Sequence, residues 1–274
     1  MLIILLFLAA ALLAAYVFVR LSGAALWQGA LFFLLVFLLL HVAYLLVLYL
    51  ASLTVSRGKP LDKQNTICRW GCAGVIGLLC AYCGVRPHIT GEDKLPTDRR
   101  FLLVCNHRSM FDPLVIMDRL RKYNISFISK PSNLRIPLVG RIAYAAGFLP
   151  IDRENNREAL KTILQAADYL KRGVCSMAVY PEGTRSRSGE MLPFHPGCFK
   201  VAQRAGVPLV VSAVRGTEHV KKHILFRGTD VYLDILDVLP PERVQTMSTN
   251  ELADYSRALM EKSLAAGSER KNDG

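Results

Sequence analysis

Two long apolar runs open the chain, and they constrain its fold more than any other feature. Residues 1–56 contain one charged side chain, Arg20, which separates a run over 2–19 from a second run over 24–53. A helix needs about 20 apolar residues to cross the hydrocarbon core of a bilayer, and a longer run can tilt. We therefore predict two transmembrane helices, forming a hairpin, over residues 1–56.

The flanks of these runs predict an orientation. The connection between them carries only Arg20, whereas four basic residues follow the second run: Arg57, Lys59, Lys63 and Arg69. By the positive-inside tendency, we expect the rest of the chain on the cytoplasmic face of the membrane. A cleaved secretory signal is the alternative for the first run, but no Lys or Arg precedes it and a second run follows. The seven cysteines, an odd number, match no framework of small secreted domains.

The next segment, 57–84, is predicted to be a membrane-interfacial linker. From 67 to 84 it is mostly apolar, yet Gly71, Gly74 and Gly77 would make it a poor isolated helix, which favours an interfacial or re-entrant segment over a third span. In a helix, its four cysteines would fall within about a third of the circumference; they are Cys68, Cys72, Cys80 and Cys83. Their spacing fits no zinc pattern closely, so we favour reduced cysteines in packing contacts over a metal or iron–sulfur site.

Strand and helix patterns alternate through residues 85–266. Strands are predicted at 101–105, 125–129, 147–151, 174–180, 208–214 and 231–239. Helices are predicted at 156–172 with Asn155 or Asn156 as N-cap, at 197–205, and from a capping box of Ser248 and Glu251 to about Ala266. Residues 267–274 are expected to be disordered. This alternation is typical of an α/β fold with a mostly parallel sheet flanked by helices, whose ligands gather at the carboxyl ends of the strands.

The charge outside the apolar runs favours anionic partners. Residues 57–274 hold 33 of the 34 Lys and Arg and all 22 Asp and Glu, a formal balance of +11 (33 − 22). A membrane surface, a phosphorylated metabolite and a nucleic acid are each compatible with that balance, and composition alone does not choose among them.

The stretch NHRSMFDP, 106–113, follows the first buried strand. Asp112 before Pro113 resembles an N-cap and first helical residue, which would fold the loop so that the Asp112 carboxylate reaches the His107 imidazole. An aspartate on one ring nitrogen fixes the tautomer and leaves the other nitrogen to act as a base. Taken alone, this pattern favours a helix-capping aspartate beside a surface histidine over a catalytic pair.

A second group of candidate residues lies in YPEGTRSRSG, 180–189, after the strand at 174–180. Gly183 allows close backbone approach and Arg185 offers a planar fork of donors, so this turn is a candidate phosphate receptor. Glu182 is expected to hold a neighbouring arginine. Lys130 and Arg153 also stand just past strand ends, and they converge with Arg185 if those ends adjoin. Solvated terminal charges are the alternative, and no nucleotide P-loop sequence is present.

The ordered blocks NHRSMFD, GFLPIDR, PEGTR and VPLVV resemble the glycerolipid acyltransferases, most closely the 1-acyl-glycerol-3-phosphate acyltransferases. The resemblance covers about residues 85–215. The fourth block departs from the family pattern, which usually ends in a second proline where Val211 and Ser212 stand here. Because that block is thought to shape the fit of the acyl chain or the acceptor, the departure bears on substrate preference more than on the chemistry.

The resemblance implies the glycerolipid acyltransferase fold and a defined reaction. A fatty acyl group would pass from a thioester, on coenzyme A or acyl carrier protein, to the free hydroxyl of lysophosphatidic acid, making phosphatidic acid in phospholipid biosynthesis. His107 would be the general base and Asp112 would orient its ring. The expected substrate-binding residues are Lys130, Arg153, Glu182, Gly183, Thr184 and Arg185. No metal, resident cofactor or nucleic acid is implied, and the other partner is the lipid bilayer.

Two alternatives remain open from the sequence. An enzyme of the same fold could act on another lyso-lipid. A non-catalytic, membrane-tethered basic module could bind anionic lipid, but that function does not explain a His–Asp pair at a strand end.

Overall fold

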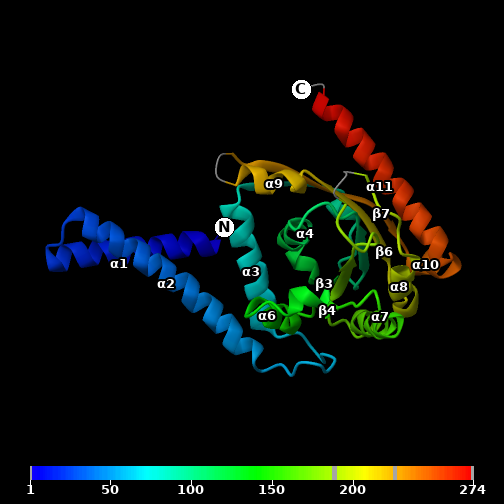
Figure 1. Cartoon of the computed structure of the whole chain (residues 1–274), viewed down its shortest axis with the longest axis horizontal. Coiled ribbons are helices and arrows are strands. Elements are labelled where there is room, and N and C mark those ends of the chain that lie inside the picture. Colours follow the sequence, from blue (N-terminus) through cyan, green and yellow to red (C-terminus); the bar gives the residue numbers. More distant parts are fainter. Residues whose placement is uncertain (1, 187–189, 225–226, 273–274) are drawn as a thin grey trace.

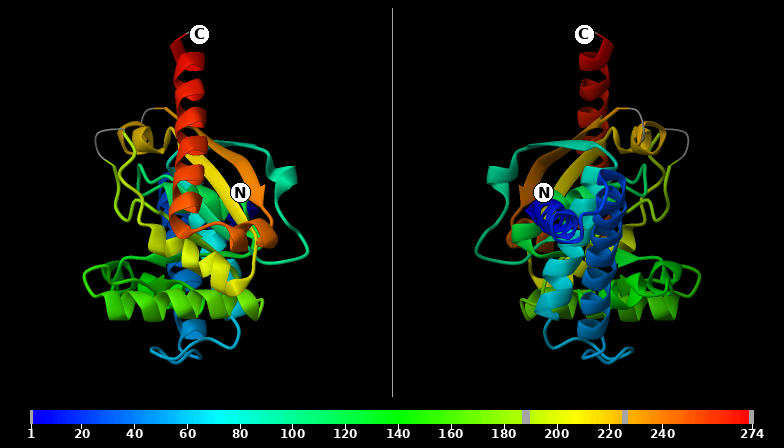
Figure 2. Two further views of the ribbon diagram at one scale, coloured as in Figure 1. Left: turned by 90° about the vertical axis from the view of Figure 1, so that its right-hand side faces the viewer. Right: turned by 90° about the vertical axis from the view of Figure 1, so that its left-hand side faces the viewer.

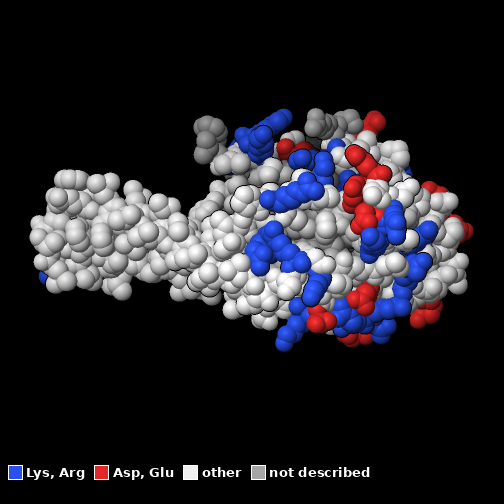
Figure 3. Space-filling view, turned by 60° about the horizontal axis from the view of Figure 1, so that its bottom comes forward, with Lys and Arg blue, Asp and Glu red and all other residues white. Residues whose placement is uncertain are grey.

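The computed structural model describes residues 2–186, 190–224 and 227–272 (Figure 1). Its first two helices, α1 (Leu2–Ser22) and α2 (Leu26–Ser52), form a hairpin that projects from the rest of the molecule. Both are long and apolar enough to cross a membrane, and most of their side chains are exposed. Figure 3 shows almost no charged side chains on the surface of the hairpin, whereas the surface of the domain carries both basic and acidic side chains. The two helices are therefore candidate membrane spans, and their orientation stays a prediction.

Helix α3 (Thr66–Tyr82) follows the hairpin, and its glycines allow close packing. Asn65 caps the first turn by accepting a hydrogen bond from Cys68 N at 2.9 Å. A Cβ at Gly71 would overlap Leu48 of α2, so the glycine lets the two helices approach each other. This tertiary contact compensates for the low helix propensity of the segment. All seven cysteines are free thiols, and Cys68 and Cys80 are buried in different apolar clusters.

Seven strands form one sheet in the order β1-β7-β6-β2-β5-β3-β4. They are β1 (Val85–Thr90), β2 (Leu102–Cys105), β3 (Ile125–Ser129), β4 (Leu149–Pro150), β5 (Ser176–Val179), β6 (Leu209–Arg215) and β7 (Thr229–Leu239). Among these strands, every neighbouring pair is parallel except β6 and β7. The expected mostly parallel sheet is confirmed, in a mixed form with β1 and β7 reversed.

Strand β1 was not expected from the sequence. Its residues, VRPHIT, include charged and polar side chains, and Pro87 lacks the N–H that a central strand requires. The strand lies at the edge of the sheet and pairs only with β7 among the described strands, where a proline is tolerated. The short β4 also differs from the expected 147–151, because only two of those residues pair with β3.

Helices cover both faces of the sheet (Figure 2). Helices α3 and α4 (Asp112–Arg119) pack on one face, and the other face carries α7 (Asn156–Lys171), α8 (Lys200–Ala205) and α11 (Thr249–Asn272). The shorter helices are α5 (Pro131–Leu134), α6 (Val139–Ala145), α9 (Thr217–His223) and α10 (Pro241–Thr246), with 3-10 turns at Glu92–Lys94, Arg121–Tyr123 and Pro196–Phe199. Two apolar clusters therefore sandwich the strands and fix where their ends lie.

Local capping signals agree with the sequence. Asn155 accepts hydrogen bonds from Arg157 N and Glu158 N at the start of α7. Ser248 and Glu251 exchange the two hydrogen bonds of a capping box before α11. Helix α11 ends at Asn272, six residues beyond the expected end near Ala266. Residues 273–274 of the expected disordered tail lie outside the described residues.

Candidate active site

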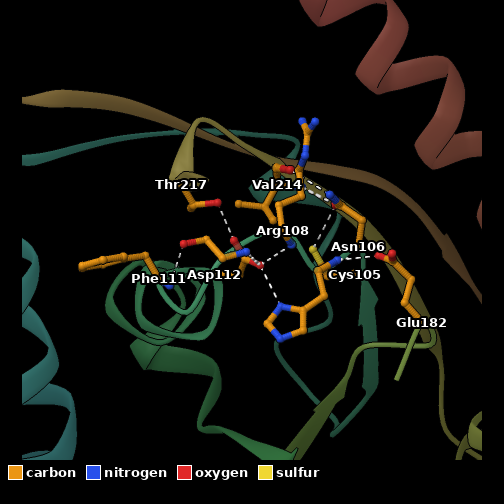
Figure 4. Close-up of polar contacts among 10 residues, drawn as sticks. Cys105, Asn106, Arg108, Phe111, Asp112, Glu182, Val214 and Thr217 are labelled. Carbon is orange, nitrogen blue, oxygen red and sulfur yellow. Dashed lines mark hydrogen bonds and ion pairs between the residues drawn. The ribbon is translucent and has the colours of Figure 1, made fainter. Parts of the chain in front are cut away.

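The His107 imidazole and the Asp112 carboxylate meet at the carboxyl end of β2. His107 Nδ1 lies 2.8 Å from Asp112 Oδ2, which also accepts hydrogen bonds from Arg108 N at 2.7 Å and Ser109 N at 2.8 Å (Figure 4). Asp112 was expected to be the N-cap of the next helix. It is instead the first residue of α4, and Phe111 occupies the N-cap position without a side-chain cap. The Asp112 carboxylate nevertheless accepts hydrogen bonds from the loop backbone, because the loop folds back and brings Arg108 N and Ser109 N to it.

A second oxygen of the same carboxylate is held from a distant element. Thr217 Oγ1 donates a hydrogen bond to Asp112 Oδ1 at 2.5 Å, and both residues are fully buried. Thr217 is the first residue of α9, directly after β6. Four donors therefore converge on one buried carboxylate and fix its orientation. Nothing in the local sequence around Thr217 points to this role.

The His107 ring is held by stacking as well as by Asp112. It lies parallel to the Tyr180 ring, with centroids 4.0 Å apart and an interplanar angle of 11°. Burial, and then the nearby Asp112 charge, raises the pKa of Tyr180 well above its ordinary value, so the phenol stays neutral. The His107 side chain is 17% exposed. Since Nδ1 faces Asp112, Nε2 is the nitrogen left for a substrate, and no partner for it is found among the described residues.

Glu182 clamps two loops together. Its Oε1 accepts a hydrogen bond from His107 N at 2.6 Å, and its Oε2 accepts one from Leu192 N at 2.9 Å. The residue is 3% exposed, and burial raises its pKa even though these backbone donors oppose the shift. We expected Glu182 to hold a neighbouring arginine. It holds the backbone N–H groups of His107 and Leu192 instead, because its two carboxylate oxygens point at them.

Further hydrogen bonds tie the same loop to its neighbours. The Asn106 amide exchanges two hydrogen bonds with the backbone of Val214 on β6, at 2.9 and 2.7 Å, and so continues the sheet pairing past the end of β2. Ser186 N donates to the His107 carbonyl at 2.9 Å. The loop is thus fixed to strand β6 on one side and to the PEGTR turn on the other.

Three cations follow strands that are neighbours in the sheet. Arg185 follows β5, Lys130 follows β3 and Arg153 follows β4, and these parallel strands lie side by side with β2. The expected adjacency of the strand ends is therefore confirmed. Within the described part of the chain, no carboxylate forms an ion pair with any of the three. Partial burial lowers the pKa of Arg153, as expected for a cation held partly away from water.

The PEGTR turn brings Arg153 and an unexpected histidine together. Gly183 has a φ of +74°, which favours glycine. A Cβ added there would lie 3.6 Å from Arg153 Cδ and 3.0 Å from His195 Cδ2, so all three residues are in close contact. Lys130, Thr184 and Arg185 are exposed at the same edge of the sheet. His195 has no sequence signal beyond its place in the segment after the turn.

Comparison with known proteins places this geometry in a family. A protein-family model described as Acyltransferase matches residues 86–215. The 1-acyl-sn-glycerol-3-phosphate acyltransferase of Escherichia coli is 32% identical over 182 residues, which are 64% of this chain and 72% of that protein. The chain belongs to the acyltransferase family.

Other relatives extend this acyltransferase comparison. The protein of the same name from Salmonella typhimurium is 34% identical over 168 residues, 60% of this chain and 66% of the relative. The human 1-acyl-sn-glycerol-3-phosphate acyltransferase beta is 29% identical over 258 residues, 92% of this chain and 88% of the relative. The crystal structure of the Thermotoga maritima enzyme PlsC, titled a 1-acyl-sn-glycerophosphate acyltransferase, superposes with a TM-score of 0.62 at 21% identity, covering 94% of this chain and 95% of that one. That superposition confirms the fold.

Proposed function

We propose that this acyltransferase transfers a fatty acyl group from a thioester to the free hydroxyl of 1-acyl-glycerol-3-phosphate, forming phosphatidic acid. The observation that carries the proposal is the His107–Asp112 pair, in which one ring nitrogen is held and the other is left for a substrate. The relatives named 1-acyl-sn-glycerol-3-phosphate acyltransferase support the choice of acceptor.

The reaction needs one base and no protein nucleophile. His107 Nε2 takes the hydroxyl proton while the acceptor oxygen attacks the thioester carbonyl. An ester C–O bond forms, the C–S bond breaks, and the imidazolium returns the proton to the leaving thiolate. Asp112 orients the ring and stabilises its cation, and its own position is fixed by Thr217 and the loop backbone. One base of this kind contributes about 10²–10⁴-fold to the rate.

The acceptor's phosphate fits the cations at the neighbouring strand ends. Lys130, Arg153 and Arg185 follow adjacent parallel strands, and none has a carboxylate partner among the described residues. Arginine forks match phosphate oxygens in a bidentate manner, and lysine adds a point charge. Arg185 follows β5, the strand next to β2, so a phosphate bound there would place the hydroxyl of the acceptor near His107.

Backbone N–H groups of the PEGTR turn are candidates for stabilising the oxyanion. Gly183 N already donates to the Tyr180 carbonyl at 3.0 Å, and Ser186 N donates to His107 O. The N–H groups of Thr184 and Arg185, for which no acceptor is found within the described residues, are the ones left to stabilise developing charge. Glu182 supports this arrangement indirectly, because it joins the turn to the His107 loop.

We further propose that the hairpin of α1 and α2 anchors the enzyme in the bilayer, with residues 57–84 at the interface and the catalytic domain, 85–266, on the cytoplasmic face. The acceptor and the product are membrane lipids, so an anchored domain meets them without leaving the surface. The basic flank after α2 supports this orientation by the positive-inside tendency.

The test uses the purified full chain in detergent with lysophosphatidic acid, offered palmitoyl-CoA and palmitoyl-acyl carrier protein in separate reactions. Phosphatidic acid should form with at least one donor, and His107→Ala should lower turnover about 10²–10⁴-fold while the variant still partitions with membranes. Near-normal turnover in His107→Ala would overturn the mechanism. Equal rates with a lyso-lipid that lacks the phosphate monoester would overturn the acceptor.

A further inference from the structure

A row of aromatic rings leads from the catalytic histidine into the core. The His107 ring stacks on Tyr180 with centroids 4.0 Å apart, and Tyr180 stacks on Phe127 at 5.7 Å. Phe148 lies beyond Phe127, at 6.0 Å. The ring planes deviate from parallel by 11° in the first pair and 23° in the second. These four side chains, which we call the aromatic row, connect the reaction centre to the buried side of the sheet.

The order of the strands produces the aromatic row. His107 follows β2 and Tyr180 follows β5, whereas Phe127 lies on β3 and Phe148 precedes β4. The four strands are neighbours in the sheet in that same order. Ala178 of β5 pairs in register with Phe127, and side chains two positions apart on a strand share a face, so Tyr180 extends along the face that Phe127 occupies.

The ring of Tyr180, and not its hydroxyl, makes the contact with His107. The Tyr180 hydroxyl oxygen is buried and has no hydrogen-bond partner among the described residues. A buried hydroxyl without a partner costs free energy that a phenylalanine would avoid. Burial also raises the pKa of Tyr180 well above its ordinary value, so the phenol is a poor proton donor. The feature of Tyr180 that can act on His107 is therefore the face of its ring.

The face of an aromatic ring carries partial negative charge and attracts a cation within about 6 Å of the ring centroid. The distance of 4.0 Å between His107 and Tyr180 is well inside that range, and it is shorter than the separation of about 4.5–7 Å that aromatic pairs prefer. In the proposed mechanism, His107 becomes a cation only when it takes the hydroxyl proton. An attraction that strengthens at this step lowers the barrier and raises kcat.

We propose that Tyr180 is a positioning residue that holds the face of the His107 ring and stabilises its cation during acyl transfer. Asp112 contacts the edge of the same ring at 2.8 Å, so the two residues support the imidazolium from perpendicular directions. Phe127 supports Tyr180 from its other side. The inference rests on the proposed function, because the cation forms only in that reaction. Tyr180 forms no bond to a substrate, and the proton passes through His107 alone.

Steady-state kinetics of the full chain in detergent provide the first test. Tyr180→Leu should lower kcat roughly tenfold and change the KM for lysophosphatidic acid little, because the ring acts on the cation and not on the bound acceptor. Tyr180→Phe should retain most of the activity, since it keeps the ring. Phe127→Leu should lower kcat less than Tyr180→Leu, because Phe127 acts through Tyr180.

The matched control for these variants is Phe101→Leu. Phe101 is a fully buried ring of the same apolar cluster, but it stands just before β2, at the other end of that strand. Its loss should lower thermal stability and leave kcat near the wild-type value at a temperature where all variants are folded. Wild-type kcat in Tyr180→Leu would overturn the proposal, as would a Tyr180→Phe variant as slow as Tyr180→Leu.

Ring fluorination separates the charge of the ring from its packing. Phenylalanine derivatives with one, two and three ring fluorines can be installed at position 180 by nonsense suppression. Fluorine withdraws electron density from the face of the ring with little change in shape, so kcat should fall stepwise as fluorines are added. The KM for lysophosphatidic acid should stay constant along the series. A flat kcat would show that Tyr180 does not stabilise the cation.

Labelling with diethyl pyrocarbonate tests the stacking without any turnover. Peptide mass spectrometry follows the modification of His107, which should be several-fold faster in Tyr180→Leu than in the wild type, because one face of the ring is uncovered. Tyr180→Phe should react at close to the wild-type rate. Equal rates in all three proteins would overturn the holding role. Absence of turnover on any lyso-lipid would end the proposed function, and the labelling rates would still decide whether Tyr180 holds His107.

Discussion

Thr217 Oγ1 donates a hydrogen bond to Asp112 Oδ1 at 2.5 Å, although the two residues are 105 positions apart in the chain. Both are fully buried, so the carboxylate that orients His107 depends on a hydroxyl from a different strand-end. In the proposed mechanism, Thr217 is a positioning residue, which acts through Asp112 and contacts no reacting atom.

Thr217→Val should lower kcat about tenfold and leave the acceptor's KM unchanged. The variant keeps the shape of the side chain but leaves a buried carboxylate oxygen without its donor, which costs about 1–3 kcal/mol. Thr217→Ser should restore most of the activity, because it restores the hydroxyl. Steady-state kinetics of the two variants are the measurement, and wild-type kcat in Thr217→Val would contradict the positioning role.

Glu182→Ala should reduce both stability and turnover. Two backbone N–H groups, of His107 and Leu192, would lose their acceptor in a buried site, at a cost of about 1–3 kcal/mol for each group left unsatisfied. Glu182→Gln should lie between wild type and Ala, because its amide offers one acceptor and turns a donor toward the other N–H. Thermal unfolding and kcat should fall in that order, and a Gln variant weaker than Ala would argue against the clamp.

Arg185→Ala should raise the KM for lysophosphatidic acid roughly tenfold or more and change kcat less. The guanidinium has no carboxylate partner among the described residues, so its donors are available to the acceptor's phosphate. Arg204→Ala, at an exposed arginine on α8, is the matched control. An unchanged KM in Arg185→Ala would remove Arg185 from the phosphate site.

Cys105→Ala should keep wild-type kcat, even though Cys105 lies two residues before His107. The thiol is fully buried, and burial raises its pKa far above the ordinary value, so it is not a thiolate nucleophile. Loss of the buried side chain should lower thermal stability modestly. Intact-mass spectrometry after mixing with acyl donor alone should detect no acylated enzyme; an acyl adduct lost in this variant would replace direct transfer by a covalent route.

Alkylation of Cys175 and Cys198 in the native protein should be slow at pH 8 and rise steadily toward pH 9. Burial raises the pKa of Cys175 to about 11 and of Cys198 to about 12. A raised thiol pKa means that the protonated, unreactive form dominates at pH 8. Iodoacetamide labelling followed by peptide mass spectrometry measures this, with urea-denatured protein as the fast reference. A native labelling rate at pH 8 equal to that of the urea-denatured protein would show that these thiols are not shielded.

Short-range features could be predicted from the sequence, because neighbouring residues decide them. The Asn155 cap and the Ser248–Glu251 capping box join residues two or three positions apart. The lengths of the apolar helices α1 and α2 follow directly from the lengths of the two apolar runs. The contact between His107 and Asp112 could also be predicted from their spacing, since a loop of that length between a strand and a helix brings the two side chains together.

The rest of the site depends on contacts that no local pattern encodes. Four of these contacts join segments far apart in the chain. They are the pairing of edge strand β1 with β7, the stacking of Tyr180 on His107, the hydrogen bond from His107 N to Glu182, and the hydrogen bond from Thr217 to Asp112. They follow from the order of strands in the sheet, which sets which loops adjoin. The sequence by itself determined which side chains stand at strand ends and which helices are apolar. Only the tertiary structure decided which of those ends meet, because pairing between distant strands is chosen by packing of the whole core and not by residues next to one another.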